Sequence, residues 1–135
     1  MALQLSVAAR NARLDAIETV IGTSAILKVA TGAPPADCAT AESGTVVATA
    51  NLPIDWMSAA SAGAKAMLGT WEDASADATG IAGHFRIYDS SGTTCHLQGT
   101  VTATGGGGDM TVDNTSFALG QDFLVTGFTL TDGNA

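Results

Sequence analysis

The sequence predicts a mainly β protein, an antiparallel, jelly-roll-like β-sandwich preceded by one N-terminal amphipathic helix. Apolar residues recur with a helical period only up to Gly22. Beyond Gly22 the period falls to two, and Gly, Pro, Asp and Ser separate the alternating stretches, as in short antiparallel strands joined by turns. We therefore expect a helix over residues 1–22 and a β-sandwich over residues 23–135, together in a single compact domain.

The helix is expected to run from about Val7 to Ile21. Val7, Leu14 and Ile21 recur every seven residues and form an apolar stripe. Ser6 is a candidate N-cap, and Gly22 suits a left-handed C-terminal cap. A lone amphipathic helix must bury its stripe, so we expect it to pack either on the sheet of its own chain or on a neighbouring subunit.

The rest of the chain is expected to form short strands. Alternation of apolar and polar residues places them at residues 25–31, 45–52, 65–72, 84–88, 94–103, 110–112 and 123–131. Residues 56–67 fit either an Ala-rich helix or an irregular crossover, and we expect a loop there. The four consecutive glycines at 105–108 predict a flexible connector.

The two strands that flank residues 89–93 are expected to form a hairpin. A five-residue loop pairs Arg86 with His96. This register separates apolar from polar side chains, as a half-buried sheet requires. The apolar face would carry Phe85, Ile87, Cys95, Leu97 and Val101. The polar face would carry His84, Arg86, Tyr88 and His96, which we call the polar hairpin face.

The composition is poor in charge and rich in small residues. Only 13% of residues are charged, and five Lys and Arg against thirteen Asp and Glu leave a net charge of −8. Such a chain lacks the basic surface that binding to nucleic acid requires. A surface of small side chains loses little conformational entropy when another subunit covers it, which favours a protein that is packed among other subunits in an assembly. A genome biased toward Ala and Gly codons is the alternative explanation.

Targeting signals are not apparent in the sequence. The first residues carry no positively charged segment, so no secretory signal is predicted. No run of 18 apolar residues occurs, so no membrane-spanning helix is predicted. We expect a product made in the cytoplasm, with no membrane partner.

The two cysteines, Cys38 and Cys95, allow at most one disulfide within the chain. They lie 57 positions apart, outside any C-x-x-C spacing. Closing a loop of that size would stabilise the fold by about 4 kcal/mol. A reducing cytosol keeps thiols free, whereas a particle released from the cell meets oxidising conditions. The sequence is compatible with two states of the cysteines: a disulfide, or two small buried thiols.

No catalytic, cofactor or metal site is predicted. His84 and His96 have no further ligands at metal-binding spacings, and the acidic stretch 72–77 lacks the pattern of a calcium loop. The glycine run is not followed by the Lys of a phosphate-binding loop. Trp56 and Trp71 are expected in the core or as anchors between subunits, not as platforms for sugars. The protein is therefore not expected to be an enzyme.

Five passages of the chain carry a resemblance: RNARLDAIE (10–18), TGAPPAD (31–37), TWEDASAD (70–77), GHFRI (83–87) and CHLQGTV (95–101). They resemble a family of small proteins encoded among the virion genes of tailed bacteriophages. The resemblance spans nearly the whole chain and implies a phage structural protein. It carries over no functional residues.

Together, resemblance and composition lead to the hypothesis of a capsid decoration or cement protein located in the virion. It would form homo-oligomers, with a trimer as one form, and would bind other virion proteins such as the major capsid protein. The expected interface anchors are Leu14, Trp56, Trp71, Phe85 and Tyr88. One alternative is a neck, collar or tail-fibre component. Another is a module that binds a host receptor or glycan through the polar hairpin face.

Overall fold

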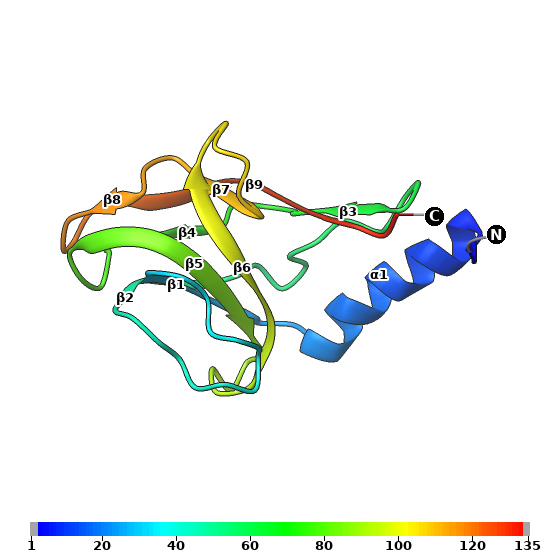
Figure 1. Ribbon diagram of the computed structural model, residues 1–135, viewed down its shortest axis with the longest axis horizontal. Coiled ribbons are helices and arrows are strands. Elements are labelled where there is room, and N and C mark those ends of the chain that lie inside the picture. The colour runs from blue at the N-terminus through cyan, green and yellow to red at the C-terminus, as the bar shows by residue number, and fades with distance from the viewer. Residues whose placement is uncertain (1–2, 134–135) are drawn as a thin grey trace.

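The computed structural model describes residues 3–133, and residues 1–2 and 134–135, the outer ends of the two predicted segments, lie outside the described residues. One helix, α1 (Val7–Ile21), is followed by strands β1 (Ile26–Thr31), β2 (Val46–Asn51), β3 (Ala64–Ala66), β4 (Glu72–Asp73), β5 (Gly80–Tyr88), β6 (Cys95–Ala103), β7 (Met110–Val112), β8 (Ser116–Phe117) and β9 (Phe123–Thr131). The prediction of a mainly β fold with one N-terminal helix is confirmed (Figure 1).

The strands form one curled, mixed sheet in the order β2-β1-β5-β6-β7-β9-β3. Outside this order, β4 pairs with β9 and β8 pairs with β5. All pairs are antiparallel except β6 with β7, which the sequence did not predict. A jelly-roll-like sandwich stays a prediction.

The parallel pair depends on the glycine run, which makes a tight return and not a loose connector. The run brings Met110 back beside Val101, so that β7 lies along β6 in the same direction. A Cβ at Gly106 would lie 2.7 Å from the Cβ of Thr102, and one at Gly108 would lie 2.9 Å from the Thr102 backbone nitrogen. Only glycine lets the returning chain approach β6 this closely.

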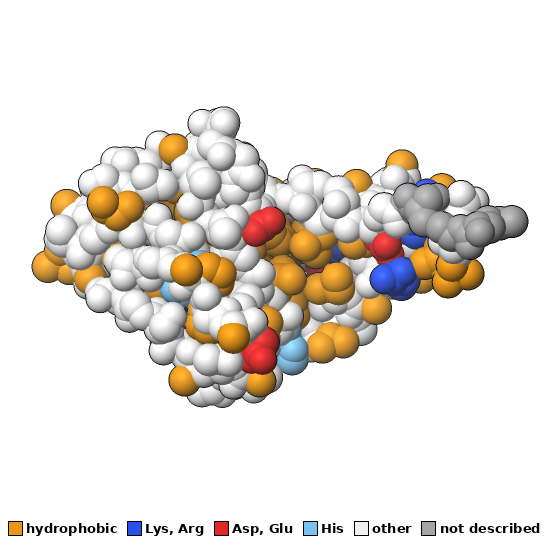
Figure 2. Space-filling model, in the orientation of Figure 1, with side chains coloured by type: hydrophobic (Ala, Val, Ile, Leu, Met, Phe, Trp, Pro, Cys, Tyr) orange, Lys and Arg blue, Asp and Glu red, His pale blue; other side chains and the backbone are white. Residues whose placement is uncertain are grey.

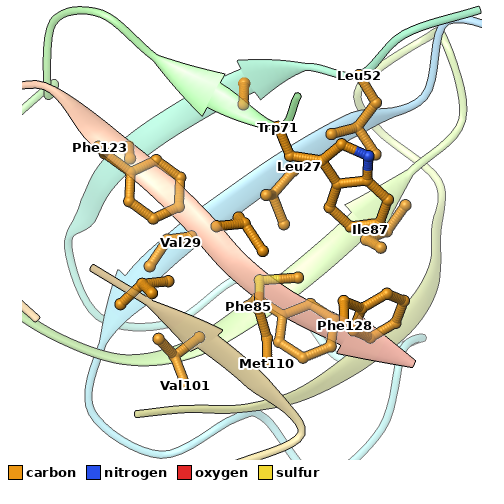
Figure 3. Packing of buried hydrophobic residues seen from close by; sticks show 14 of the residues in the cluster. Leu27, Val29, Leu52, Trp71, Phe85, Ile87, Val101, Met110, Phe123 and Phe128 are labelled. Carbon is orange, nitrogen blue, oxygen red and sulfur yellow. The ribbon is translucent and has the colours of Figure 1, made fainter. Parts of the chain in front are cut away.

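The core lies where the sheet curls over itself, with β9 crossing the strands β1 and β5 (Figure 3). Phe85 of β5 meets Phe128 of β9 with ring centroids 5.5 Å apart, and Trp71 lies 5.4 Å from Phe128. Trp56 packs 5.9 Å from Trp71. Because each aromatic side chain buries a large apolar area, this chain of rings is the main link between the two halves of the curl.

Helix α1 has the predicted limits and N-cap, but Gly22 has a ψ of −170° and so does not form the predicted left-handed cap. The Ser6 hydroxyl accepts a hydrogen bond from the Ala9 backbone N–H at 3.2 Å, and Gly22 adopts a positive φ of 81°. The helix buries Leu14 and Ile21 against its own chain. No helix within residues 3–133 has the length and hydrophobicity to span a membrane.

The segment between β2 and β5 contains much less strand than predicted. The expected strand at residues 65–72 is replaced by the three-residue β3 and the two-residue β4, which pair with opposite ends of β9. The chain leaves β9 between them, and the Trp71 side chain enters the core at this point. β3, the C-terminal end of β9 and α1 project from the body, and we call these three elements the stem (Figure 1).

Candidate functional site

The β5–β6 hairpin has a register that moves Cys95 to a different face. Arg86 lies opposite Gln98, not His96, and Ile87 lies opposite Leu97. A bulge then places Tyr88 opposite Cys95, so one residue of β6 is left over. Since successive side chains alternate between faces, this extra residue transfers Cys95 from the predicted apolar face to the face of Arg86 and Tyr88.

The polar hairpin face is covered and not exposed as predicted. Residues 32–45, which connect β1 to β2, lie across it, and we call this segment the covering arm. The Nδ1 atom of His84 lies 3.0 Å from the Gly32 carbonyl oxygen. Gln98 donates from Nε2 to the Pro35 carbonyl at 2.7 Å. The arm therefore supplies carbonyl acceptors to polar side chains that would otherwise face water.

Arg86 holds the middle of the covering arm. Its Nη2 donates to the carbonyl oxygens of Asp37, Cys38 and Thr40 at 3.2, 2.8 and 2.9 Å. The side chain is buried, and these hydrogen bonds offset part of the cost of removing a guanidinium from water, whereas its Nε is buried without a hydrogen-bond partner. Burial alone would lower the pKa of Arg86, but its neighbours, chiefly Cys95, shift the pKa upward overall. Arg86 thus stays charged and fixes the arm in place.

A pocket of about 310 Å³ lies between the covering arm and the hairpin. Its polar wall contains Lys28 and Glu42, which form an ion pair at 3.0 Å, and the Tyr88 hydroxyl donates to Glu42 at 3.2 Å. Cys38 and Cys95 also line it. Within residues 3–133, no group of three or more His, Cys, Asp or Glu side chains is arranged to hold a metal ion. The distinctive chemistry of this pocket is therefore its pair of thiols.

The two thiols are free and half-buried. Burial raises the pKa of the Cys38 thiol to about 11, with a further contribution from its hydrogen bond to the Cys95 side chain. The Cys95 Sγ also donates to the Leu97 carbonyl at 3.5 Å. Residues 57 positions apart in the sequence thus meet in one pocket.

His96, the leftover residue of the bulge, is separated from the rest of the polar hairpin face. Its Nε2 lies 3.7 Å from the Asp89 carboxylate. On its other side it borders a small apolar hollow of about 240 Å³ beside α1, with Ile17 and Val20. His84 and His96 therefore do not share a ligand site.

The five predicted interface anchors lie inside the protomer instead. Each has at most 4% of its surface exposed: Leu14, Trp56, Trp71, Phe85 and Tyr88. Two of their polar atoms are also satisfied internally, because the Trp56 Nε1 donates to the Gly22 carbonyl and the Tyr88 hydroxyl donates to Glu42. These side chains have almost no area left for another molecule, so partner contacts must use other residues.

Several exposed apolar side chains lie on the stem or in the segment that borders it. Val20 and Ile54 are 66% and 75% exposed, and Val7 and Leu68 are also exposed. Ile54 and Leu68 border a hollow of about 780 Å³ between α1 and residues 54–59, which we call the stem pocket. Figure 2 shows apolar side chains in the hollow beside the stem and few charged side chains on this face. Sequence periodicity could not place Ile54 or Leu68 beside α1.

A buried lysine joins the stem together. The Lys65 ammonium of β3 donates to Asp15 and Glu18 of α1, both at 2.7 Å, and to the Ser58 carbonyl at 2.8 Å. Burial alone would lower the pKa of Lys65, but the hydrogen bonds to the two carboxylates raise it overall. All three ammonium protons have acceptors, so Lys65 is a structural cross-link and not a free nucleophile. Nothing in the local sequence around Lys65 marks it as buried.

Comparisons with protein-family models, with curated proteins and with solved structures found nothing that matches this chain.

Proposed function

We propose that this protein is a structural component of a tailed-phage virion, a capsid decoration protein that assembles through its stem. The observation that carries the proposal is the division of its large apolar side chains. The aromatic ones point into the core, whereas four aliphatic ones are exposed on or beside the stem: Val7, Val20, Ile54 and Leu68. Three others are exposed elsewhere on the body: Ile81, Leu119 and Leu124. Exposed apolar side chains on and beside a projecting element favour an interaction surface there.

The rest of the surface suits repeated subunit contacts. Ala, Thr and Gly are abundant and charge is sparse, so a partner can approach closely at little cost in side-chain entropy (Figure 2). The expected partners are further copies of this chain and the major capsid protein. Each contact would be weak, and repetition over a shell would multiply the effect. In this proposal the curled sheet serves as a distorted, jelly-roll-like sandwich that carries the stem.

The glycan-binding alternative depended on an exposed polar hairpin face, and this face is not exposed. His84, Arg86 and Tyr88 are buried beneath the covering arm, and His96 faces α1. No other group of aromatic and polar side chains replaces them in the described residues. The neck or collar alternative differs from decoration mainly in copy number.

The first experiment is a census of purified particles of the phage that encodes this chain, by quantitative mass spectrometry. A decoration protein should be present in hundreds of copies per head, because every capsomer binds it. About a dozen copies would instead identify a collar or tail component. Absence of the chain from intact particles would remove the proposal altogether.

The second experiment tests the stem itself. Val20→Asp and Ile54→Asp each place a charge on the exposed apolar surface and should abolish incorporation into particles, while leaving the circular dichroism spectrum unchanged. Leu119→Asp is the matched control, because Leu119 is 71% exposed outside the stem. Equal loss of incorporation in all three variants would show that the stem is not the docking surface.

A further inference from the structure

We propose that Cys38 and Cys95 form a thiol–disulfide switch, in which oxidation by a small-molecule disulfide staples the covering arm to the β5–β6 hairpin. This inference does not depend on the proposed function. It concerns how firmly the arm is held, whatever the protein binds.

The structure places the two cysteines in one pocket and fixes the backbone on either side of it. Arg86 fixes the Cys38 main chain through the carbonyl oxygen at 2.8 Å, and further hydrogen bonds to the Asp37 and Thr40 carbonyls hold the residues on either side. Cys95 is aimed at the same pocket by the bulge opposite Tyr88. Both cysteine side chains line the same pocket. A disulfide requires this kind of approach of two side chains from a fixed backbone.

A reagent can reach the pair. Both cysteines are half-buried and line a pocket of about 310 Å³. The lining of the pocket includes Gly92 and Thr93 of the hairpin loop, whose side chains are small. In Figure 1 the covering arm and this loop run close together at the edge of the body.

Glutathione disulfide is the oxidant used for the proposal. The thiolate of one cysteine attacks a glutathione sulfur, a mixed disulfide forms, and one glutathione leaves as its thiolate. The thiolate of the second cysteine then attacks the protein sulfur of that mixed disulfide, so the Sγ–Sγ bond forms and a second glutathione leaves. The two thiol protons pass to the two departing thiolates, and the two electrons lost by the protein reduce one glutathione disulfide to two glutathione molecules.

The reduced pair should react slowly near neutral pH. Because the pKa of the Cys38 thiol is raised to about 11, that thiol is almost entirely protonated at pH 7, and only the thiolate attacks a disulfide. The rate of closure should therefore rise with pH, because the Cys38 thiolate takes part in one of the two exchange steps whichever cysteine reacts first. This favours a pair that stays reduced inside a cell and closes on long exposure to oxidising surroundings.

The test uses the whole native chain at graded ratios of glutathione disulfide to glutathione. Free thiols are then blocked with a maleimide, and the intact mass is measured. We expect both thiols to disappear together, with a mass loss of two hydrogen atoms, no glutathione adduct and no linked dimer. Thermal unfolding of the oxidised protein should shift upward by on the order of 10 °C, and cleavage within the covering arm by a protease should slow.

The single variants Cys38→Ser and Cys95→Ser are the matched controls. Each should keep a single reactive thiol and show no upward shift in unfolding temperature under oxidation. Three results would overturn the proposal: two thiols that persist at the most oxidising ratio, stable glutathione adducts on the wild-type chain, or disulfides between chains in place of one within the chain. Since the decisive measurement is made on the wild-type protein, it does not depend on whether the variants fold.

Discussion

Replacing Lys65 with methionine is expected to loosen the stem, because the change keeps the apolar part of the side chain and removes only its charge. The ammonium is 2% exposed and has three acceptors at 2.7 to 2.8 Å. Its loss leaves Asp15 and Glu18 as unpaired like charges three positions apart on α1, and the Ser58 carbonyl without its donor.

The magnitude follows from burial. Removing one partner of a fully buried ion pair costs about 3–5 kcal/mol. Here Asp15 is 48% exposed and regains water, so we expect Lys65→Met to lower the free energy of unfolding by about 2–3 kcal/mol. For a chain of this length that corresponds to a fall in Tm of about 7–11 °C.

Thermal and urea unfolding at pH 7, with a reducing agent present, would measure the loss. Arg13→Met is the matched control: the Arg13 side chain also joins α1 to the end of the stem, through Asp132 at 3.2 Å, but it is 64% exposed and should contribute less than about 1 kcal/mol. Adding Asp15→Asn to Lys65→Met should recover part of the stability, with a coupling energy of at least about 1 kcal/mol. Equal losses in the Lys65 and Arg13 variants, or no coupling with Asp15, would refute the assignment of Lys65 as the cross-link.

Acid should weaken the same contact. The hydrogen bond from the buried lysine is the main cause that holds the pKa of Asp15 below its ordinary value. The stabilising contribution of this carboxylate is therefore complete above about pH 4 and is lost as the pH falls through its folded-state pKa. The midpoint of urea unfolding, measured between pH 5 and 2, should decline less for Asp15→Asn than for the wild type. Gly83→Ala should cost about 2–4 kcal/mol in urea unfolding, because its methyl group would lie 2.3 Å from a backbone oxygen of the covering arm. Gly105→Ala, at a φ of +86° in open space, should cost only about 1 kcal/mol, and equal costs would contradict the close packing of the arm. Trp71→Ala should remove about 3–5 kcal/mol in thermal unfolding, whereas Leu119→Ala should stay within about 0.5 kcal/mol; a small loss at Trp71 would contradict its place in the aromatic core.

The covering arm explains why a polar hairpin face can exist in the interior. A strand face with His, Arg and Tyr normally faces water, and burial without partners would cost several kcal/mol. The arm carries few large side chains and offers its backbone carbonyls instead. Its weakly apolar sequence is therefore a poor guide to its structural importance.

Local structure was determined by the sequence alone. The limits and the N-cap of α1 were predicted, because Ser6, Gly22 and the recurrence of apolar residues mark the ends of the helix locally. The strand over residues 123–131 was also placed correctly, as β9, since alternation over nine residues is a strong signal. Such signals need no knowledge of what lies across the sheet.

The set of residues that line the pocket between the covering arm and the hairpin was decided only by the tertiary structure. A single extra residue in β6 reverses which face Cys95 occupies, and no periodicity in the sequence marks a bulge of one residue. The position of Cys38 in this pocket depends on Arg86, which is nearly fifty positions away and donates a hydrogen bond to the Cys38 carbonyl. The predicted anchors turned inward for the same kind of reason: a large aromatic side chain suits a core and an interface equally, and only the curl of the sheet determines which of the two encloses it.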